Sequence, residues 1–176
     1  THADDRKPLF TEKRFNTFKK KYAPYKNIYE QNIKHLKFAN WFFETKLLGY
    51  SYSHTLRDIF SSEDSSHLIS SQTISELEAH RHVRFVGTLT DIIKRTSRNG
   101  NKYARLDLCD ELGSVSCLFM DAQNNERFTN YLNSGRKLPK KSDIVIITGQ
   151  KGDDIVFVDK INILQDKIYM KLSELK

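Results

Sequence analysis

The second half of the chain alternates apolar and polar residues with the period of two that half-buried β-strands show. The pattern is clearest at residues 103–109, where Ala104, Leu106 and Leu108 fall on one face and the residues between them on the other. Comparable runs predict four more strands, at residues 83–93, 115–119, 143–149 and 155–163. A stretch with helical spacing, residues 121–134, separates the third predicted strand from the fourth.

Upstream of the strands, apolar residues recur at spacings of three, four and seven, which is typical of amphipathic helices. Pro24 interrupts this pattern, so we predict two helical pieces, residues 11–22 and 25–48. Gly49 follows as a helix-ending residue. The predicted buried face of the second piece consists of Tyr29, Ile33, Leu36, Phe43 and Leu47.

A change of composition divides the chain. Residues 61–82 are rich in Ser and acidic side chains, which predicts a linker with one short helix within 71–79. We therefore divide the chain into a basic helical segment (1–60), this linker (61–82), a strand-rich domain (83–163) and a C-terminal helix or tail (164–176).

The order of the predicted elements indicates an α+β fold of a known type. Three strands, a helix and two further strands are the sequence of elements in the OB-fold, a five-stranded Greek-key barrel. In that fold the face of strands two and three, with the first and fourth inter-strand loops, binds oligonucleotides or oligosaccharides. We therefore predict a helical N-terminal segment followed by an OB-fold barrel with a helix between strands three and four.

The charge of the chain favours an anionic partner. Its 176 residues include 29 Lys and Arg against 22 Asp and Glu, a net charge of +7. Residues 1–60 carry a net +6, residues 61–82 a net −3 and residues 83–176 a net +4. A basic balance of this kind favours polyanions, of which nucleic acid is the most common.

Candidate binding residues follow from what holds a single nucleic-acid strand, namely a basic groove with aromatic side chains on which bases stack. The second predicted strand presents Tyr103 and Arg105 on its outward face, and the loop before it is basic. For Tyr103 a half-buried surface aromatic, and for Arg105 a cross-strand pair with a carboxylate, remain alternatives. The predicted nucleic-acid-binding set is Arg95, Arg98, Lys102, Tyr103, Arg105, Ser116, Leu118 and Lys151.

We predict no catalytic residue, no metal site and no cofactor for this chain. Cys109 and Cys117 lie in strand patterns and are interpreted as reduced thiols, and the six histidines lack metal-ligand spacing. Asp107, Asp110 and Glu111 flank a turn and are interpreted as solvated carboxylates. No apolar run approaches the roughly 20 residues that span a bilayer, so we expect no membrane partner.

Residues 44–56 resemble the segment that precedes the OB domain in the alpha subunit of bacterial DNA polymerase III. That family has Leu-Gly-Phe/Tyr followed by Ser/Thr-Gly-His-Pro-Leu, and this chain keeps Leu48-Gly49-Tyr50 but shows Tyr52-Ser53-His54-Thr55 in place of the second part. In the predicted barrel, residues 98–104 and 108–115 are similar to the family's basic loop and to its Leu-x-Asp-x-x-Gly turn.

The resemblance implies the C-terminal part of a replicative polymerase that binds single-stranded template DNA and contains no catalytic palm. It implies the remaining polymerase and other replisome subunits as partners, and the cytoplasm of a bacterium or of a virus-infected host as location. We do not expect a sliding clamp to bind, because Arg6 stands where the family's clamp peptide has Gln. Two alternatives stay open: an anticodon- or RNA-binding OB domain like that of an aminoacyl-tRNA synthetase, and a protein-docking module.

Overall fold

The computed structural model describes most of the strand-rich half and part of the helical half. The described residues are 12–13, 16–17, 19–20, 23, 31–61, 67–122 and 125–164. Half of the predicted helical piece at 11–22, the residues that we compared with a clamp peptide and residues 165–176 of the predicted C-terminal helix or tail lie outside them.

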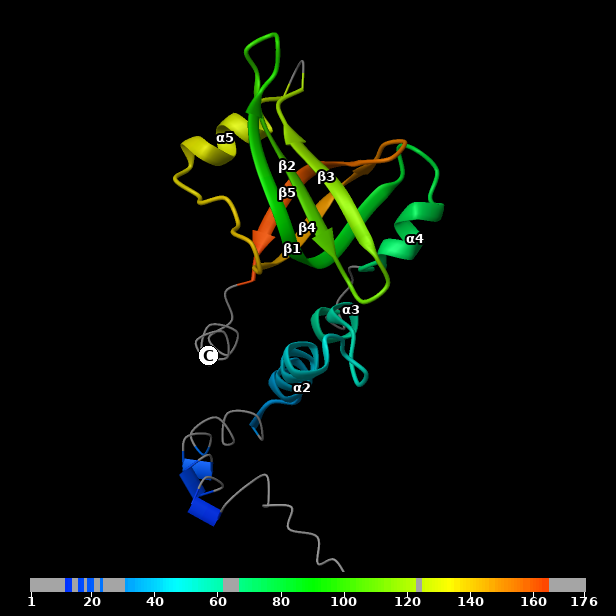
Figure 1. Ribbon diagram of the computed structural model, residues 1–176. Helices are drawn as coiled ribbons and strands as arrows, with labels where there is room; N and C mark the ends of the chain where they lie inside the picture. Colours follow the sequence, from blue (N-terminus) through cyan, green and yellow to red (C-terminus); the bar gives the residue numbers. More distant parts are fainter. Residues whose placement is uncertain are drawn as a thin grey trace, which may run out of the picture.

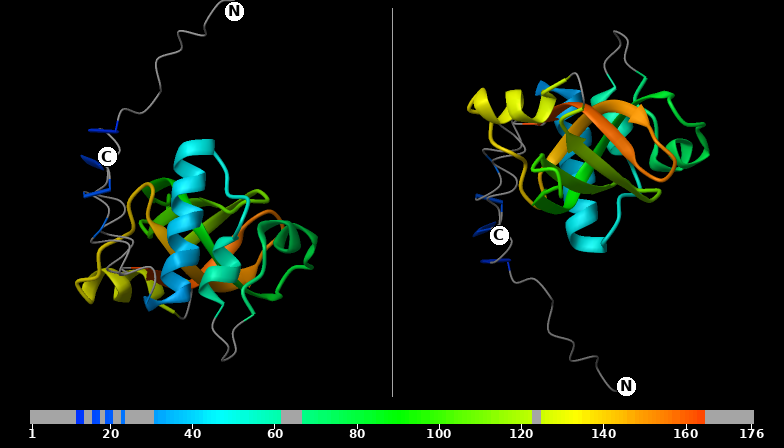
Figure 2. Two further views of the ribbon diagram at one scale, coloured as in Figure 1. Left: turned by 90° about the horizontal axis from the view of Figure 1, so that it is seen from below. Right: turned by 90° about the horizontal axis from the view of Figure 1, so that it is seen from above.

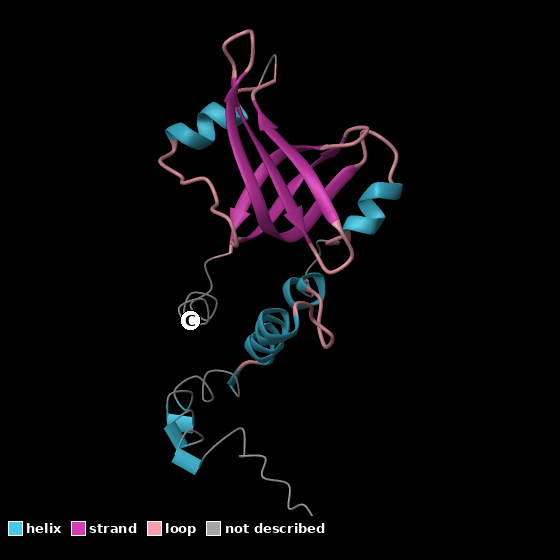
Figure 3. Cartoon of the chain, in the orientation of Figure 1, coloured by secondary structure: helices cyan, strands magenta, loops and turns pink. Residues whose placement is uncertain are grey.

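Five strands form a closed barrel, which confirms the predicted OB-fold (Figures 1 and 3). The order around the barrel is β1-β2-β3-β5-β4, and all neighbours are antiparallel except β3 and β5. The strands are β1 (His82–Thr96), β2 (Lys102–Cys109), β3 (Ser114–Met120), β4 (Ile144–Lys151) and β5 (Val156–Ile163). The helices are α2 (Ile33–Leu48), α3 (Leu56–Phe60) and α4 (Ser71–Glu76) before the barrel and α5 (Arg127–Asn133) between β3 and β4.

Strand β1 belongs to both halves of the barrel, because its first part pairs with β4 and its second part with β2. The strand bends near Gly87, where an added Cβ would lie 2.7 Å from a ring carbon of Phe85 and 2.8 Å from the carbonyl oxygen of Cys109. The register with β2 then shifts between Leu89 and Asp91. A bend and a bulge of this kind let one long strand curl round the barrel.

The barrel interior is filled by the alternating apolar residues that the sequence predicts. Ala104, Leu106 and Leu108 of β2 are fully buried. Ile74 of α4 and Phe128 of α5 join the same core from opposite sides of the barrel in Figure 1. The inserted helix is shorter than the predicted 121–134.

Helix α2 buries a face that differs in part from the predicted one, of which Phe43 is half-buried and Tyr29 lies outside the described residues. Ile33, Leu36 and Leu47 are 73%, 41% and 77% exposed. The buried residues are instead Phe38, Ala39 and Trp41. Helical spacing shows that a helix has an apolar stripe, but the partner decides which stripe is covered.

The partner that covers α2 is a second apolar cluster outside the barrel. Phe38 and Trp41 stack with ring centroids 5.7 Å apart and an interplanar angle of 26°. The cluster contains Leu56 and Ile59 of α3 together with residues from the outer surface of β1 and β4, namely Val86, Ile144 and Ile146. In Figure 2, α2 crosses one end of the barrel.

Part of the segment that we interpreted as a linker packs against the barrel. Leu68, Ser70 and Ser71 are buried. The side chain of Ser70 accepts a hydrogen bond from the Thr73 N–H and caps α4, and the Ile69 N–H donates to the Arg84 carbonyl oxygen at 2.9 Å. Residues 67–76 therefore contribute to the covering of the barrel.

The turn between β2 and β3 holds helices on two sides, so our interpretation of Asp110 and Glu111 as solvated carboxylates is wrong. Glu111 Oε1 accepts hydrogen bonds from Trp41 Nε1 at 2.6 Å and from the Leu56 N–H at 2.8 Å. Asp110 accepts from the Ser71 N–H at 2.9 Å. The carboxylate oxygens of both residues accept hydrogen bonds from α2, α3 and α4, because the turn lies between these helices.

Glu111→Ala is expected to destabilise the protein by about 1–3 kcal/mol, since the indole N–H and a backbone N–H lose their acceptor. Urea unfolding followed by fluorescence measures this, and Trp41 is the single tryptophan of the chain. Its emission should shift to the red before the barrel unfolds. Glu111→Gln, which keeps a side-chain oxygen, should retain most of the stability. Equal stability of the alanine variant and the natural protein would contradict this account.

Candidate functional site

The outward side chains of β1, β2 and β3 form rows across the sheet. Arg95 pairs with Tyr103, which pairs with Met120. In the next row Arg105 pairs with Leu118. Directly paired residues of antiparallel strands lie on the same face. The sequence-predicted residues Arg95, Tyr103, Arg105 and Leu118 therefore share one outer surface, which we call the β2–β3 face.

Phe157 of β5 extends the β2–β3 face, and our sequence analysis did not select it. Phe157 is the register partner of Leu118 and is 44% exposed. An added Cβ on Gly152 would lie 2.7 Å from a carbon of its ring, so the ring lies over the turn between β4 and β5. The sequence could have indicated this residue, because Phe157 alternates with Val156 and Val158, which are buried, and must therefore point outward.

Arg105 pairs with a carboxylate of its own strand β2 and with a hydroxyl of β3, not with a carboxylate across the strands as in the alternative that we left open. Its Nε lies 3.3 Å from Asp107 Oδ1, and its Nη2 donates to Ser116 Oγ at 3.3 Å. The Ser116 hydroxyl in turn donates to Asp107 Oδ1 at 2.7 Å. The Arg105 side chain is still 52% exposed. The network therefore orients a guanidinium that remains accessible, and Ser116 acts by positioning it.

The charges on the β2–β3 face are distributed unevenly along the strands. Asp91 pairs with Asp107, further from the β1–β2 hairpin than the rows of Tyr103 and Arg105. A hydrogen bond from Lys141, whose Nζ lies 2.8 Å from Asp91 Oδ1, holds the pKa of Asp91 below its usual range. An anionic ligand is thus favoured at the hairpin end of the face.

Tyr103 lies at that hairpin end, in a hollow of about 250 Å³. The hollow is lined on one side by Lys94, Arg95, Thr96, Lys102 and Tyr103 and on the other by Phe128, Leu132 and Leu138. It therefore places a half-buried aromatic ring and apolar side chains beside exposed cations.

The hairpin loop presents a further cation. Its backbone is held by Ser97, whose N–H donates to the Asn101 carbonyl oxygen at 2.8 Å and whose hydroxyl accepts from the Asn101 N–H at 3.1 Å. Arg98 is exposed in this turn, and the hairpin projects beyond the barrel in Figure 1. Arg95, Arg98 and Lys102 are therefore brought together at one end of the molecule.

The structure does not bring Lys151 to this surface. Lys151 is the last residue of β4, not part of an exposed turn, and it is 7% exposed. Its Nζ donates to the carbonyl oxygen of Asp153, and its backbone N–H donates to the Arg81 carbonyl oxygen at 2.9 Å. A buried ammonium that is already hydrogen-bonded has little capacity to contact a ligand.

Neither thiol has the environment of a nucleophile. Burial raises the pKa of Cys109, and the nearby carboxylates of Asp110 and Glu111 raise it further. Burial also strongly raises the pKa of Cys117. Within the described ranges, no three His, Cys, Asp or Glu side chains gather where they could hold a metal ion, and no described helix is long and apolar enough to span a bilayer.

The strand order defines the chain as an OB-fold protein. No family model and no curated protein matches it. Similar solved structures include the crystal structure of yeast Stn1 and Ten1, at 14% identity and a TM-score of 0.39, covering 52% of this chain and 48% of that chain. This chain thus spans about half the length of that protein.

Two further structures share the fold at similar levels. They are the mitochondrial single-stranded DNA-binding protein Rim1 from S. cerevisiae (13% identity, TM-score 0.40, 51% of this chain and 99% of that chain) and asparaginyl-tRNA synthetase from Pyrococcus horikoshii (19%, 0.41, 57% and 23%). The likeness concerns the fold alone.

The comparisons overturn the resemblance to the polymerase III alpha subunit, because they give other OB-fold proteins and no such polymerase. The residues behind the resemblance have a local explanation. Gly49, at a φ of 86°, ends α2 with its N–H donating to the Thr45 carbonyl oxygen at 3.0 Å. The Glu44 carboxylate then accepts from the N–H groups of Tyr52 at 2.6 Å and Ser53 at 2.9 Å. Leu-Gly-Tyr is here a helix end followed by a turn.

The raised thiol pKa values predict slow chemical modification. At pH 8 the folded protein should react with Ellman's reagent far more slowly than a free thiol, with Cys117 the slower of the two, because thiolate is the reacting form. Unfolding in guanidinium should release two thiols per chain. Single Cys109→Ser and Cys117→Ser variants assign the rates. Rapid labelling of Cys117 in the folded state would contradict the assignment.

Proposed function

We propose that this chain binds single-stranded nucleic acid at the hairpin end of its β2–β3 face. The observation that carries the proposal is the hollow in which Tyr103 lies between apolar side chains and the cations Arg95 and Lys102. Single strands are held by such a combination of aromatic platform and basic groove, and the OB-fold uses this face for it. The net charge of +7 agrees with a polyanionic ligand.

Each part of the surface has a role in this proposal. A base stacks on Tyr103, and the half-buried Leu118 and the exposed Phe157 extend the platform across β3 and β5. Arg95, Arg98 and Lys102 neutralise phosphates. Arg105, held by Asp107 and Ser116, supplies guanidinium donors to a phosphate or a base edge.

Charge reversal at the hairpin, Arg95→Glu with Arg98→Glu and Lys102→Glu, is expected to weaken binding to a labelled oligo-dT of about 20 nucleotides at least tenfold. Loss of three phosphate contacts should reduce the slope of log K against log salt by about 2. Fluorescence anisotropy across a salt series measures both. A matched control reverses Lys34, Lys46 and Arg57 on α2 and α3, which changes the net charge equally. If the hairpin variant and the control bind alike, the site assignment is wrong.

Tyr103→Ala is expected to weaken binding by about 1–3 kcal/mol through the loss of base stacking, with little change in the salt slope. Tyr103→Phe keeps the ring and should bind nearly as the natural protein does. The same anisotropy assay measures these constants, and thermal melting checks that both variants are folded. Equal losses for phenylalanine and alanine would assign Tyr103 a hydroxyl contact in place of stacking.

The same titration separates the proposal from the two alternatives. Tighter binding of a structured RNA than of oligo-dT would favour an anticodon-type RNA module. Absence of binding to every nucleic acid at low salt would favour a protein-docking module. The exposed apolar residues of α2, Ile33, Leu36 and Leu47, are the surface to mutate in that case.

A further inference from the structure

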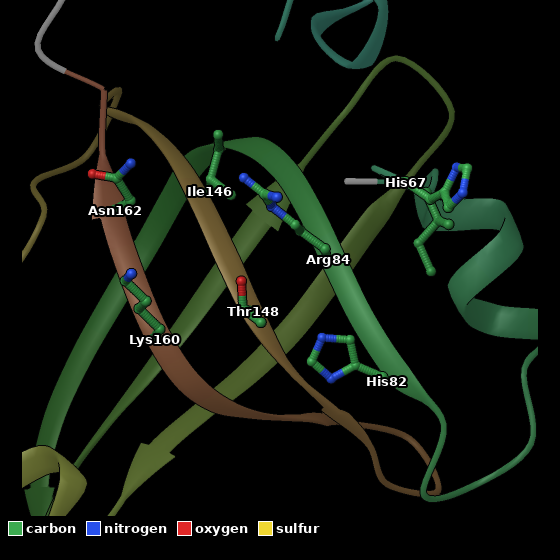
Figure 4. Close-up of a pocket in the computed structure, with 8 residues that line it drawn as sticks. His67, His82, Arg84, Ile146, Thr148, Lys160 and Asn162 are labelled. Carbon is green, nitrogen blue, oxygen red and sulfur yellow. The ribbon is translucent and has the colours of Figure 1, made fainter. Parts of the chain in front are cut away.

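A second surface of the barrel carries cations that the proposed binding face does not use. Arg84 of β1, Thr148 of β4 and Lys160 of β5 are register partners, so they stand in one row on the outer surface of these strands. Figure 4 shows these three side chains on neighbouring strands, with Asn162 near Lys160. Together with His67 and His82 they line a hollow of about 620 Å³.

The chemistry of this hollow suits an anion. Its polar lining consists of cations, imidazoles, a hydroxyl and an amide, and no described lining residue is Asp or Glu. The Nε of Arg84 is buried and has no hydrogen-bond partner among the described residues. An unsatisfied buried donor costs free energy until an acceptor reaches the guanidinium. Ile69 and Ile146 provide an apolar wall.

The hollow continues into a second one across the edge of β5. This second hollow, of about 590 Å³, shares Lys160 and Asn162 with the first and adds Arg136 and Lys137. The Tyr131 hydroxyl donates to the Lys137 carbonyl oxygen at 2.8 Å, which holds this segment against α5. We call Arg84, Lys160, Arg136 and Lys137 the cationic track.

The cationic track comes close to the hollow around Tyr103. Leu132 and Leu138 line the hollow beside Tyr103, whereas Arg136 and Lys137 line the hollow beside Lys160. The segment from α5 to residue 138 therefore separates the two surfaces and belongs to both. A single nucleic-acid strand that crosses this segment would pass from the cations beside Tyr103 to the cationic track.

We infer that the cationic track binds the phosphate backbone of a longer single strand, part of which occupies the β2–β3 face. This inference rests on the proposed function. The cations are spread along two adjoining hollows and do not converge on one point, which fits a polymer of phosphates better than one small anion. The track adds phosphate contacts and salt dependence, since backbone contacts carry no direct sequence readout.

The test compares two lengths of labelled oligo-dT, about 8 and about 25 nucleotides, because one OB-fold contacts about 4–16 nucleotides. The track variant is Lys160→Glu with Arg136→Glu and Lys137→Glu, three exposed residues. It should bind the long oligonucleotide at least tenfold more weakly, with a salt slope smaller by about 2. Binding of the short oligonucleotide should change less than twofold. Arg84→Gln should lower the long-oligonucleotide slope by about 0.7.

The controls separate this inference from the proposed function. The Lys34, Lys46 and Arg57 reversal matches the change in net charge, and thermal melting confirms the fold of each variant. If the track variant binds the long oligonucleotide with the affinity and salt slope of the natural protein, the inference is wrong and the proposed function is unaffected. If the natural protein binds neither length, the proposed function fails and the inference with it. If the long oligonucleotide binds and only the track variant weakens it, while the hairpin variant does not, the hairpin site is wrong and so is the inference that one strand occupies both surfaces.

Discussion

The whole barrel depends on the double pairing of β1. This strand hydrogen-bonds β4 along its first part and β2 along its second. It therefore has to bend while its backbone stays hydrogen-bonded to both neighbours. The close approach of Phe85 and of the Cys109 carbonyl oxygen to Gly87 leaves no space for a side chain there. The register shift before Asp91 completes the turn. Without this curl, β3 and β5 would not meet to close the barrel.

The strands were predictable from the sequence because each has one buried face, and alternation records that face locally. The helices before the barrel were not. The stripe of α2 that packs is set by the aromatic cluster with α3, β1 and β4, which are distant in sequence, and spacing alone selected Ile33 and Leu47. Asp110 and Glu111 show the same limitation, since a turn carboxylate looks solvated until the elements packed around it are known.

The candidate site also contains residues that the local sequence predicts and residues that depend on long-range strand pairing. Arg95, Arg98, Lys102 and Tyr103 belong to one hairpin, so their proximity was readable from a short stretch of sequence. Lys151 was misplaced because the end of β4 lies inside the packed region. The place of Phe157 depends on the pairing of β5 with β3, and that of Arg84 on the pairing of β1 with β4, and both pairings join strands that are distant in sequence.

The turn between β2 and β3 has a consequence for protein engineering. Exposed hairpin turns are usually good places to insert a tag or a reporter domain. Here Glu111 anchors α2 and α3 and Asp110 anchors α4, although the neighbouring Leu112 is 60% exposed. An insertion at this turn would break the hydrogen bonds that tie α2, α3 and α4 to the barrel, all at once.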